Sequence, residues 1–297
     1  MEMKKTTIVI TALLAILILG CINQKPTVKE GIEISVNLTL YKLARGADTT
    51  LQAVVTNYLD QSLYDVQAGI VKYVSSDITI PEENPQTIPE IRPKVPVRFY
   101  WTLHVTENAQ ENSEYNQNVR VCFNYTTISY HDLLITPLTS NASIEKGQNV
   151  APISLEFIGL EDAKSTKSLR SIPFTIVLSN KYKGRPTSLG FNLLDDKIRE
   201  FNIEIPSNDL FDAQASPALQ SQWDFTCTKN EGTKVFYCKN GIPIQLLLYG
   251  ESYEARLPFT LNNLKQASSD VVLRIKANTT YTYCFDSPQI TFQVIKG

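Results

Sequence analysis

The stretch LQAVVTNYLDQSLYDVQAGIVKY, residues 51–73, decides the fold class. Apolar and polar residues alternate over residues 51–58 and again over residues 63–73. Successive side chains of a strand point to opposite faces, so this period of two predicts two strands that each bury one face. Similar runs recur over residues 32–40, 95–105 and 119–128 and, in the second half, at short spacing between residues 172 and 275, with a hint of a short helix only over residues 211–222. The chain is therefore predicted to be all-β and antiparallel.

Composition supports two domains of ordinary size. The chain has 297 residues, of which 43% are hydrophobic, enough for each domain to bury a core. Its 14 tyrosines and 12 phenylalanines are typical of strands. The 28 basic and 30 acidic residues nearly cancel, so charge gives no indication of a nucleic-acid partner.

The N-terminus has the layout of an export signal. Lys4 and Lys5 precede an uncharged stretch, TTIVITALLAILILG, that ends at Cys21. The residues around Cys21, ILGC, resemble the lipobox of prokaryotic lipoproteins, in which the cysteine sulfur carries the lipid. We therefore expect a signal peptide or membrane anchor over residues 1–21 and a tether over residues 22–31. Contact with membrane lipid is expected through Cys21 or, alternatively, through an uncleaved N-terminal helix, with the rest of the chain at the cell surface, on the outer face of the cytoplasmic membrane.

The two halves of the chain match each other in short segments. ISVNLTL from Ile34 resembles ISLEFIGL from Ile153, and AVVTN ending at Asn57 resembles TIVLSN ending at Asn180. Later matches follow in the same order: VRFYWTL from Val97 with ARLPFTL from Ala255, NYTT from Asn124 with NTT from Asn278, and Asp132 and Ile135 with Asp286 and Ile290. This order predicts β-sandwich domains over residues 32–140 and 150–297, the second with an inserted hairpin region over about residues 208–241. Two unrelated β domains and one large sandwich are the alternatives.

The first half is similar to the immunoglobulin-like domains of archaeal envelope proteins. In TLQAVVTNYLDQSLYDVQAGIVKY a strand ends at Asn57, a turn follows at Leu59, and an outward strand resumes through Val66. The resemblance covers mainly residues 30–135 and implies an immunoglobulin-like sandwich with a role in surface display or assembly, without catalytic residues. Strand spacing extends the expectation to two such antiparallel sandwiches in tandem. The second half shows no clear equivalent of the turn after Asn180.

Four cysteines remain when Cys21 is set aside. Cys227 and Cys238 flank a segment with a predicted turn at Gly232, which places them opposite each other in a hairpin and predicts a disulfide. Cys122 and Cys284 would then pair across the domain boundary. Free buried thiols are the alternative.

Four sequons are candidate glycosylation sites if the chain is exported. They lie at Asn37, Asn124, Asn141 and Asn278, and each is expected to face solvent.

Residues suited to catalysis or metal binding are scarce. The two histidines, His104 and His131, have no partner at metal-ligand spacing, and no GxSxG elbow or glycine-rich phosphate loop occurs. No catalytic residue, metal site or cofactor is predicted, and the chain is not expected to be an enzyme. Aromatic residues at Trp101 and Trp223 either fill the core or form platforms for a glycan, and the alternation around Tyr100 favours the core.

These observations predict a membrane-tethered extracytoplasmic protein that makes protein–protein contacts at the cell envelope, with envelope proteins or copies of itself as partners. One alternative is a filament subunit that donates the strand over residues 32–40 to its neighbour. The other is a glycan- or substrate-binding lipoprotein that uses Trp101 and Trp223.

Overall fold

The structure is a computed structural model that describes residues 31–137, 143–160, 164–165, 170–248, 251–252 and 254–297. Their regular structure is almost entirely β-strand, mostly antiparallel, as the alternation predicted, and together these residues form one compact unit. The predicted signal segment with Cys21 lies outside the described residues. Within them, no helix has the length and apolar character needed to cross a membrane.

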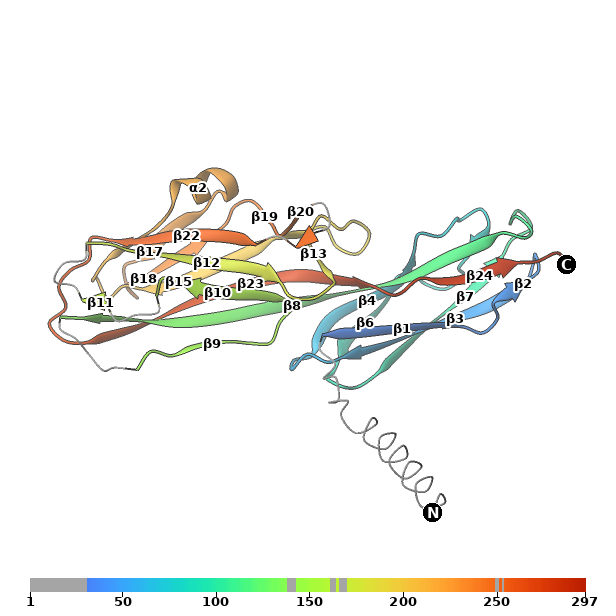
Figure 1. Cartoon of the computed structure of the whole chain (residues 1–297), viewed down its shortest axis with the longest axis horizontal. Helices are drawn as coiled ribbons and strands as arrows, with labels where there is room; N and C mark the ends of the chain where they lie inside the picture. Colours follow the sequence, from blue (N-terminus) through green and yellow to red (C-terminus); the bar gives the residue numbers. More distant parts are fainter. Residues whose placement is uncertain (1–30, 138–142, 161–163, 166–169, 249–250, 253) are drawn as a thin grey trace, which may run out of the picture. The chain divides into compact units, whose positions relative to one another are not determined.

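The first sandwich encloses its core between two sheets (Figure 1). One sheet has the order β1 (Ile32–Leu38), β3 (Asp48–Asn57), β7 (Val97–Val105) and β5 (Ile78–Thr79). The other has the order β6 (Gln86–Ile91), β4 (Leu63–Val71), the first part of β8 (Glu114–Thr136), β24 (Ile290–Val294) and β2 (Lys42–Leu43). Strand β3 shows how the sequence pattern works, because Leu51, Ala53 and Val55 are fully buried while the residues between them reach towards solvent.

The second sandwich repeats this plan. One sheet has the order β10 (Ile153–Ile158), β12 (Ile172–Asn180), β22 (Ala255–Asn262) and β16 (Asp212–Ala215). The other has the order β17 (Thr226–Asn230), β18 (Val235–Lys239), β15 (Glu200–Pro206), β23 (Val271–Asp286) and the end of β8. The remaining elements are β9 (Lys146–Gln148), β11 (Lys164–Ser165), β13 (Arg185–Thr187), β14 (Lys197–Ile198), β19 (Ile244–Gln245), β20 (Leu247–Leu248), β21 (Glu251–Ser252) and helix α2 (Pro217–Trp223), which Ser216 caps by accepting a hydrogen bond from Leu219 N.

Segments that match in sequence occupy matching strands in the two sandwiches. Ile32 lies opposite Asn57 in the β1–β3 pair, and Ile153 lies opposite Asn180 in the β10–β12 pair. The turns that follow also match, because Asn57 Nδ2 donates to Gln61 O (2.8 Å) and Asn180 Nδ2 donates to Gly184 O (2.9 Å). The expectation that no equivalent turn follows Asn180 was wrong. The anchor of each turn is the asparagine amide itself, so the residues between it and its acceptor are free to differ.

Strands β8 and β23 run through both sandwiches (Figure 1). They pair over all 16 residues of β23, from Val271 opposite Ile135 to Asp286 opposite Arg120. Strand β8 starts beside β4 and β24 in the first sandwich and ends beside β9 and β11 in the second. Strand β23 lies beside β15 in the second sandwich over residues 276–280 and ends where β8 pairs with β4 in the first. Each sandwich is thus completed by a strand from the other half of the chain.

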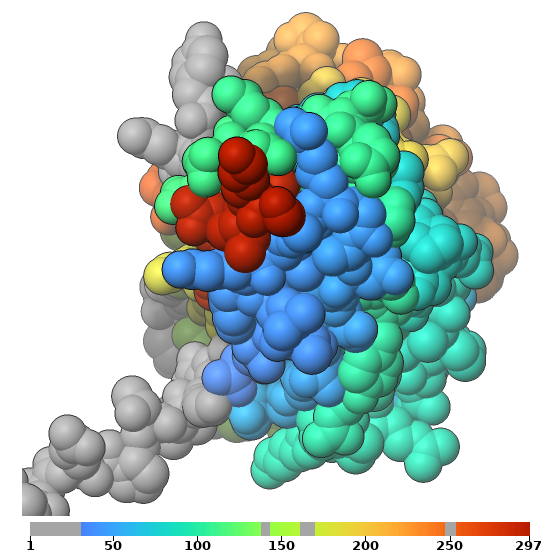
Figure 2. Space-filling view, turned by 90° about the vertical axis from the view of Figure 1, so that its right-hand side faces the viewer, coloured from blue at the N-terminus to red at the C-terminus, as the bar shows by residue number. Residues whose placement is uncertain are grey.

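The C-terminal strand belongs to the first sandwich. Strand β24 pairs with residues 114–117 of β8 and runs parallel to β2, with Lys42 opposite Gln293. Figure 2 shows the C-terminal residues, in red, packed against the N-terminal strands, in blue. The segment 290–294, which the predicted second domain (150–297) includes, therefore contributes to the other core. Residues 140–150 therefore do not divide the two sandwiches. That the second copy of the repeat begins there stays a prediction.

Candidate functional site at the seam between the sandwiches

The seam is defined here as the part of the β8–β23 ribbon between its two terminal arginine–aspartate pairs. Thr126 and Thr280 lie opposite each other near its middle, with their hydroxyl oxygens 3.1 Å apart and 154 residues between them in the chain. The same separation relates Arg120 to Arg274 and Asp132 to Asp286. The sequence match between the two aspartates therefore marks one ion pair used twice, once at each end of the seam.

Arg120 closes the first end. Its Nε and Nη2 donate to the two carboxylate oxygens of Asp286 at 2.7 and 3.0 Å, and Nη1 donates to Phe191 O at 3.1 Å. This two-bond geometry is the strong form of an arginine–carboxylate pair. The Arg120 side chain is only 10% exposed, so water competes little for these bonds.

Arg274 closes the second end in the same way. Its Nε and Nη2 donate to Asp132 at 2.8 and 3.1 Å, and Nη2 also donates to Glu145 Oε2 at 2.7 Å. The hydrogen bonds from Arg274 lower the pKa of Asp132, and burial of the carboxylate opposes this shift only in part. The guanidinium also stacks over the Tyr130 ring at 4.4 Å, so this end is held by both charge and contact.

The disulfide Cys122–Cys284 joins the two strands of the ribbon. The two cysteines are directly opposite, with Cα atoms 4.1 Å apart, and both side chains are buried. They sit in a continuous row that crosses from one sandwich to the other, since Gln67 of β4 lies opposite Cys122 and Arg185 of β13 lies opposite Cys284. The second disulfide, Cys227–Cys238, joins β17 to β18 at opposite positions. Both pairings considered from the sequence are therefore formed.

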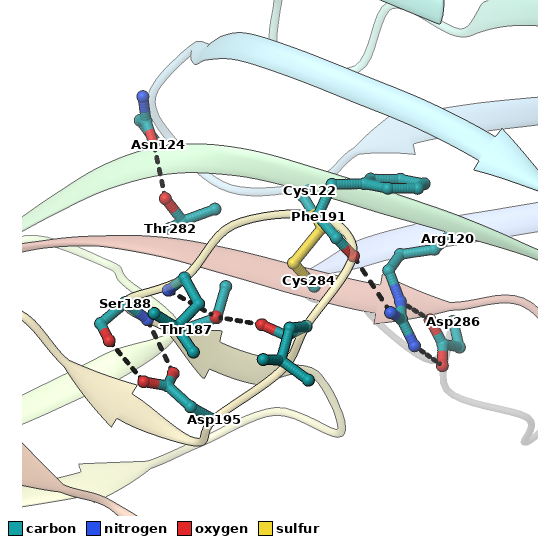
Figure 3. The surroundings of a disulfide bond; sticks show 12 residues. Arg120, Cys122, Asn124, Thr187, Ser188, Phe191, Asp195, Thr282, Cys284 and Asp286 are labelled. Carbon is teal, nitrogen blue, oxygen red and sulfur yellow. Dashed lines mark hydrogen bonds and ion pairs between the residues drawn. A yellow bond between two sulfur atoms is a disulfide. The ribbon is translucent and has the colours of Figure 1, made fainter. Parts of the chain in front are cut away.

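A loop over residues 188–195 covers the seam disulfide (Figure 3). Phe191 packs on both sulfur-bearing residues and is 7% exposed. The loop is closed at its base because Ser188 N donates to Asp195 Oδ1 at 2.8 Å and the Ser188 hydroxyl donates to Oδ2. Burial raises the pKa of Asp195, but hydrogen bonds from Ser188, Thr187 and the Lys197 backbone together outweigh it and lower the pKa overall. The charged carboxylate thus holds the loop over the disulfide.

The two histidines lie in different surroundings. His104 is half-buried on β7, with Nδ1 2.7 Å from Asp48 Oδ1. His131 is buried on β8, with Nδ1 2.9 Å from the backbone oxygen of Asp132. Among the described residues, no three histidine, cysteine or acidic side chains gather as a metal-ion site.

The predicted sequons differ in exposure. Asn37 on β1 and Asn124 on β8 are exposed, whereas Asn278 on β23 is half-buried and accepts a hydrogen bond from Asn202. Asn141 lies outside the described residues. Glycan attachment at these positions stays a prediction.

The alternative in which Trp101 and Trp223 form platforms for a glycan is wrong, and the favoured interpretation, that they fill the core, is confirmed. Trp101 is fully buried in the first sandwich and stacks on Phe99, with ring centroids 6.0 Å apart, and Trp223 is 5% exposed in the second. Tyr100 points to the opposite face and is 49% exposed, as the alternation predicted. Neither tryptophan can present a face to a sugar.

The seam was the main feature missed from the sequence. The signal was the recurrence of an arginine and an aspartate at the same spacing in both halves, Arg120 with Asp132 and Arg274 with Asp286. Only the aspartates were matched, and their partners could not be assigned without knowing that β8 and β23 lie side by side.

No protein-family model and no curated protein matches the sequence. Among solved structures, the chain matches the C-terminal domain of the Streptococcus agalactiae AgI/II polypeptide BspA with a TM-score of 0.24 and 9% identity. The match covers 88% of this chain and 100% of that one. The C-terminal domain of the Streptococcus pyogenes antigen I/II-family protein AspA gives a TM-score of 0.23 and 8% identity, over 88% and 99%. Similarity this low adds nothing to the contacts described above.

Proposed function

We propose that this chain is an exported, membrane-tethered protein that presents two interlocked β-sandwiches for protein contacts at the outer face of the cell envelope, without catalysis. The pair of cross-strand disulfides carries this proposal, because disulfides form and persist mainly in oxidising compartments. The uncharged segment before Cys21 supplies a route across the membrane and an attachment point.

The seam suits a protein that presents surfaces in a fixed arrangement. Two domains on a flexible linker move relative to each other by default. Here the backbone of β8 and β23 is hydrogen-bonded through both sandwiches and closed by Arg120–Asp286 and Arg274–Asp132. A partner that touches both sandwiches would then meet a preformed surface, which lowers the ordering cost of binding.

The loop over the seam disulfide is the contact surface that we favour. Leu189 and Leu193, on either side of the buried Phe191, are 60% and 61% exposed, more than any other large apolar side chain in the described part of the chain. Apolar residues at such a tip are suited to a pocket on a partner. They are also close to the seam, where contacts from both sandwiches can contribute.

Native membranes provide the test. Mass spectrometry should find lipid on Cys21, protease added to intact cells should digest the sandwiches, and crosslinking should capture an envelope protein. Leu189→Asp with Leu193→Asp should abolish the crosslink, whereas the matched pair Leu40→Asp with Tyr41→Asp, at another exposed site, should leave it intact. Protection from external protease, or a crosslink unchanged by the loop variants, would contradict the proposal.

Donation of residues 32–40 to a filament neighbour has less support. Strand β1 pairs along its whole length with β3 of the same chain, and Ile34 and Leu38 lie in the first core. Donating this strand would remove both side chains from the core that they now fill.

A further inference from the structure

A cleft of about 510 Å³ lies where the two sandwiches meet. One wall is the end of β4 and the turn after it, including Val71, Lys72 and Tyr73. The other wall comes from the second sandwich and includes Arg185, Asn192 and Leu194. The cleft therefore exists only because the seam holds the two sandwiches together.

The charges that line the cleft are all positive. Lys72, Arg120 and Arg185 contribute to its surface, and no aspartate or glutamate does. Two of the three already have a carboxylate partner, since Arg120 bonds Asp286 and Arg185 bonds Asp196 through Nε (2.6 Å) and Nη2 (2.5 Å). The Asp196 hydrogen bonds raise the pKa of Arg185, so it stays charged. Its Nη1 makes no bond to the described residues and is free to donate.

Lys72 is the uncompensated charge at the rim. It is exposed and forms no ion pair with any described residue. Tyr73 and Asn192 add a hydroxyl and an amide that have no hydrogen-bond partner in the described part of the chain. The rim thus offers cationic donors suited to a carboxylate beside neutral groups suited to hydroxyls.

Strand β4 offers no free edge to a peptide in the cleft. Strand β4 pairs with β8 on one side at Ile70. On the other side the Asn84 amide occupies its edge, accepting from Ile70 N at 2.8 Å and donating to Ile70 O at 3.0 Å. An extended peptide would gain affinity from such an edge if it were free, whereas a sugar does not need one.

We propose that this cleft binds an acidic saccharide, with a uronate carboxylate held by Lys72 and Arg185 Nη1 and sugar hydroxyls held by Tyr73 and Asn192. The half-buried side chains of Val71 and Leu194 line the same cleft and suit the carbon face of a sugar ring. Asn192 and Leu194 belong to the same loop as the leucines of the protein-contact proposal, but Leu189 and Leu193 do not line the cleft, and saccharide binding does not depend on that proposal.

The test is to titrate the full-length chain, in detergent, with an oligogalacturonate and to measure the heat of binding by calorimetry. We expect saturable binding that Lys72→Glu weakens at least about tenfold, as expected for loss of one charge-assisted hydrogen bond. Asn192→Ala and Tyr73→Phe should weaken it by smaller factors. The matched control is Lys239→Glu, an equal charge change at an exposed position on β18 that should leave binding unchanged.

Three outcomes would overturn the proposal. The first is no saturable binding by the folded chain. The second is equal weakening by Lys72→Glu and Lys239→Glu, which would mean general charge attraction. The third is equal affinity for an oligoglutamate of the same charge, or for a neutral oligosaccharide of the same length, which would remove the preference for an acidic sugar.

Discussion

Replacing Phe292 with alanine should destabilise the first sandwich, although Phe292 is almost at the C-terminus and follows the whole second sandwich in the chain. The side chain is 1% exposed and stacks on Tyr115 with ring centroids 5.6 Å apart. Its strand also donates from Gln293 N to Tyr41 O at 2.9 Å. Phe292→Ala therefore removes a large side chain from a core made mostly of residues 31–125.

The expected cost is about 3–5 kcal/mol, the usual range for a buried phenylalanine. Whole domains are stable by roughly 5–15 kcal/mol, so the first sandwich would keep only part of its stability. At about 1.4 kcal/mol per factor of ten, amide exchange through opening of that sandwich should speed up by about 10²-fold to a few thousand-fold.

Hydrogen exchange with mass spectrometry would measure this by segment. Peptides from β1 and β3 should lose protection before peptides from β10 and β12. Phe259→Ala is the matched control, because Phe259 is also 1% exposed but lies on β22, and it should give the reverse order. Loss of protection in β10 and β12 first for Phe292→Ala would show that β24 does not act in the first core, and the strand exchange would be refuted.

Three further results are expected. Arg274 lowers the pKa of Asp132 in the folded state, so the charged Asp132 should stabilise the protein above pH 3.8, the ordinary aspartate value. This stabilisation should be lost as the pH falls through the lowered pKa. The urea midpoints of wild type and Asp132→Asn should therefore converge in acid. A mild reductant should open Cys227–Cys238 first, because Cys227 is half-buried on an edge strand whereas Cys122 and Cys284 lie under Phe191. Alkylation followed by mass spectrometry would show this order. Phe191→Ala should reduce the difference in reduction rate between the two disulfides. Gln117→Met should raise the free energy of unfolding by about 1 kcal/mol, because the buried Gln117 Oε1 has no hydrogen-bond partner among the described residues; an unchanged or lower urea midpoint would contradict this.

Features set by neighbouring residues could be predicted from the sequence. The alternation over residues 51–58 predicted a strand with one buried face, because side-chain direction in a strand depends only on the local backbone. In the structure that face carries Leu51, Ala53 and Val55. The hairpin disulfide Cys227–Cys238 followed from a turn between two short strands. Both inferences needed no knowledge of which distant strands lie side by side.

Features set by distant pairing could not be predicted in the same way. Alternation showed that residues 119–128 form a strand, but it did not show that the strand continues to Thr136 in another sandwich or that β23 lies beside it. The match of Ile135 with Ile290 was present in the sequence. That match could be interpreted only with the fold in hand. Ile135, from the first half of the chain, lies in the second sandwich, and Ile290, from the second half, lies in the first.

The two disulfides stabilise the chain over very different lengths. Cys227 and Cys238 are 11 residues apart, and closing so short a loop is worth about 3 kcal/mol in the chain-entropy model. Cys122 and Cys284 are 162 residues apart, which corresponds to about 5 kcal/mol in the same model. The larger effect falls on the seam, where both sandwiches depend on strands that arrive from the other half. Since β23 and β24 follow the other strands of the second sandwich in the chain, the first sandwich can be completed, and Cys284 can join Cys122, only after the second half of the chain has been synthesised.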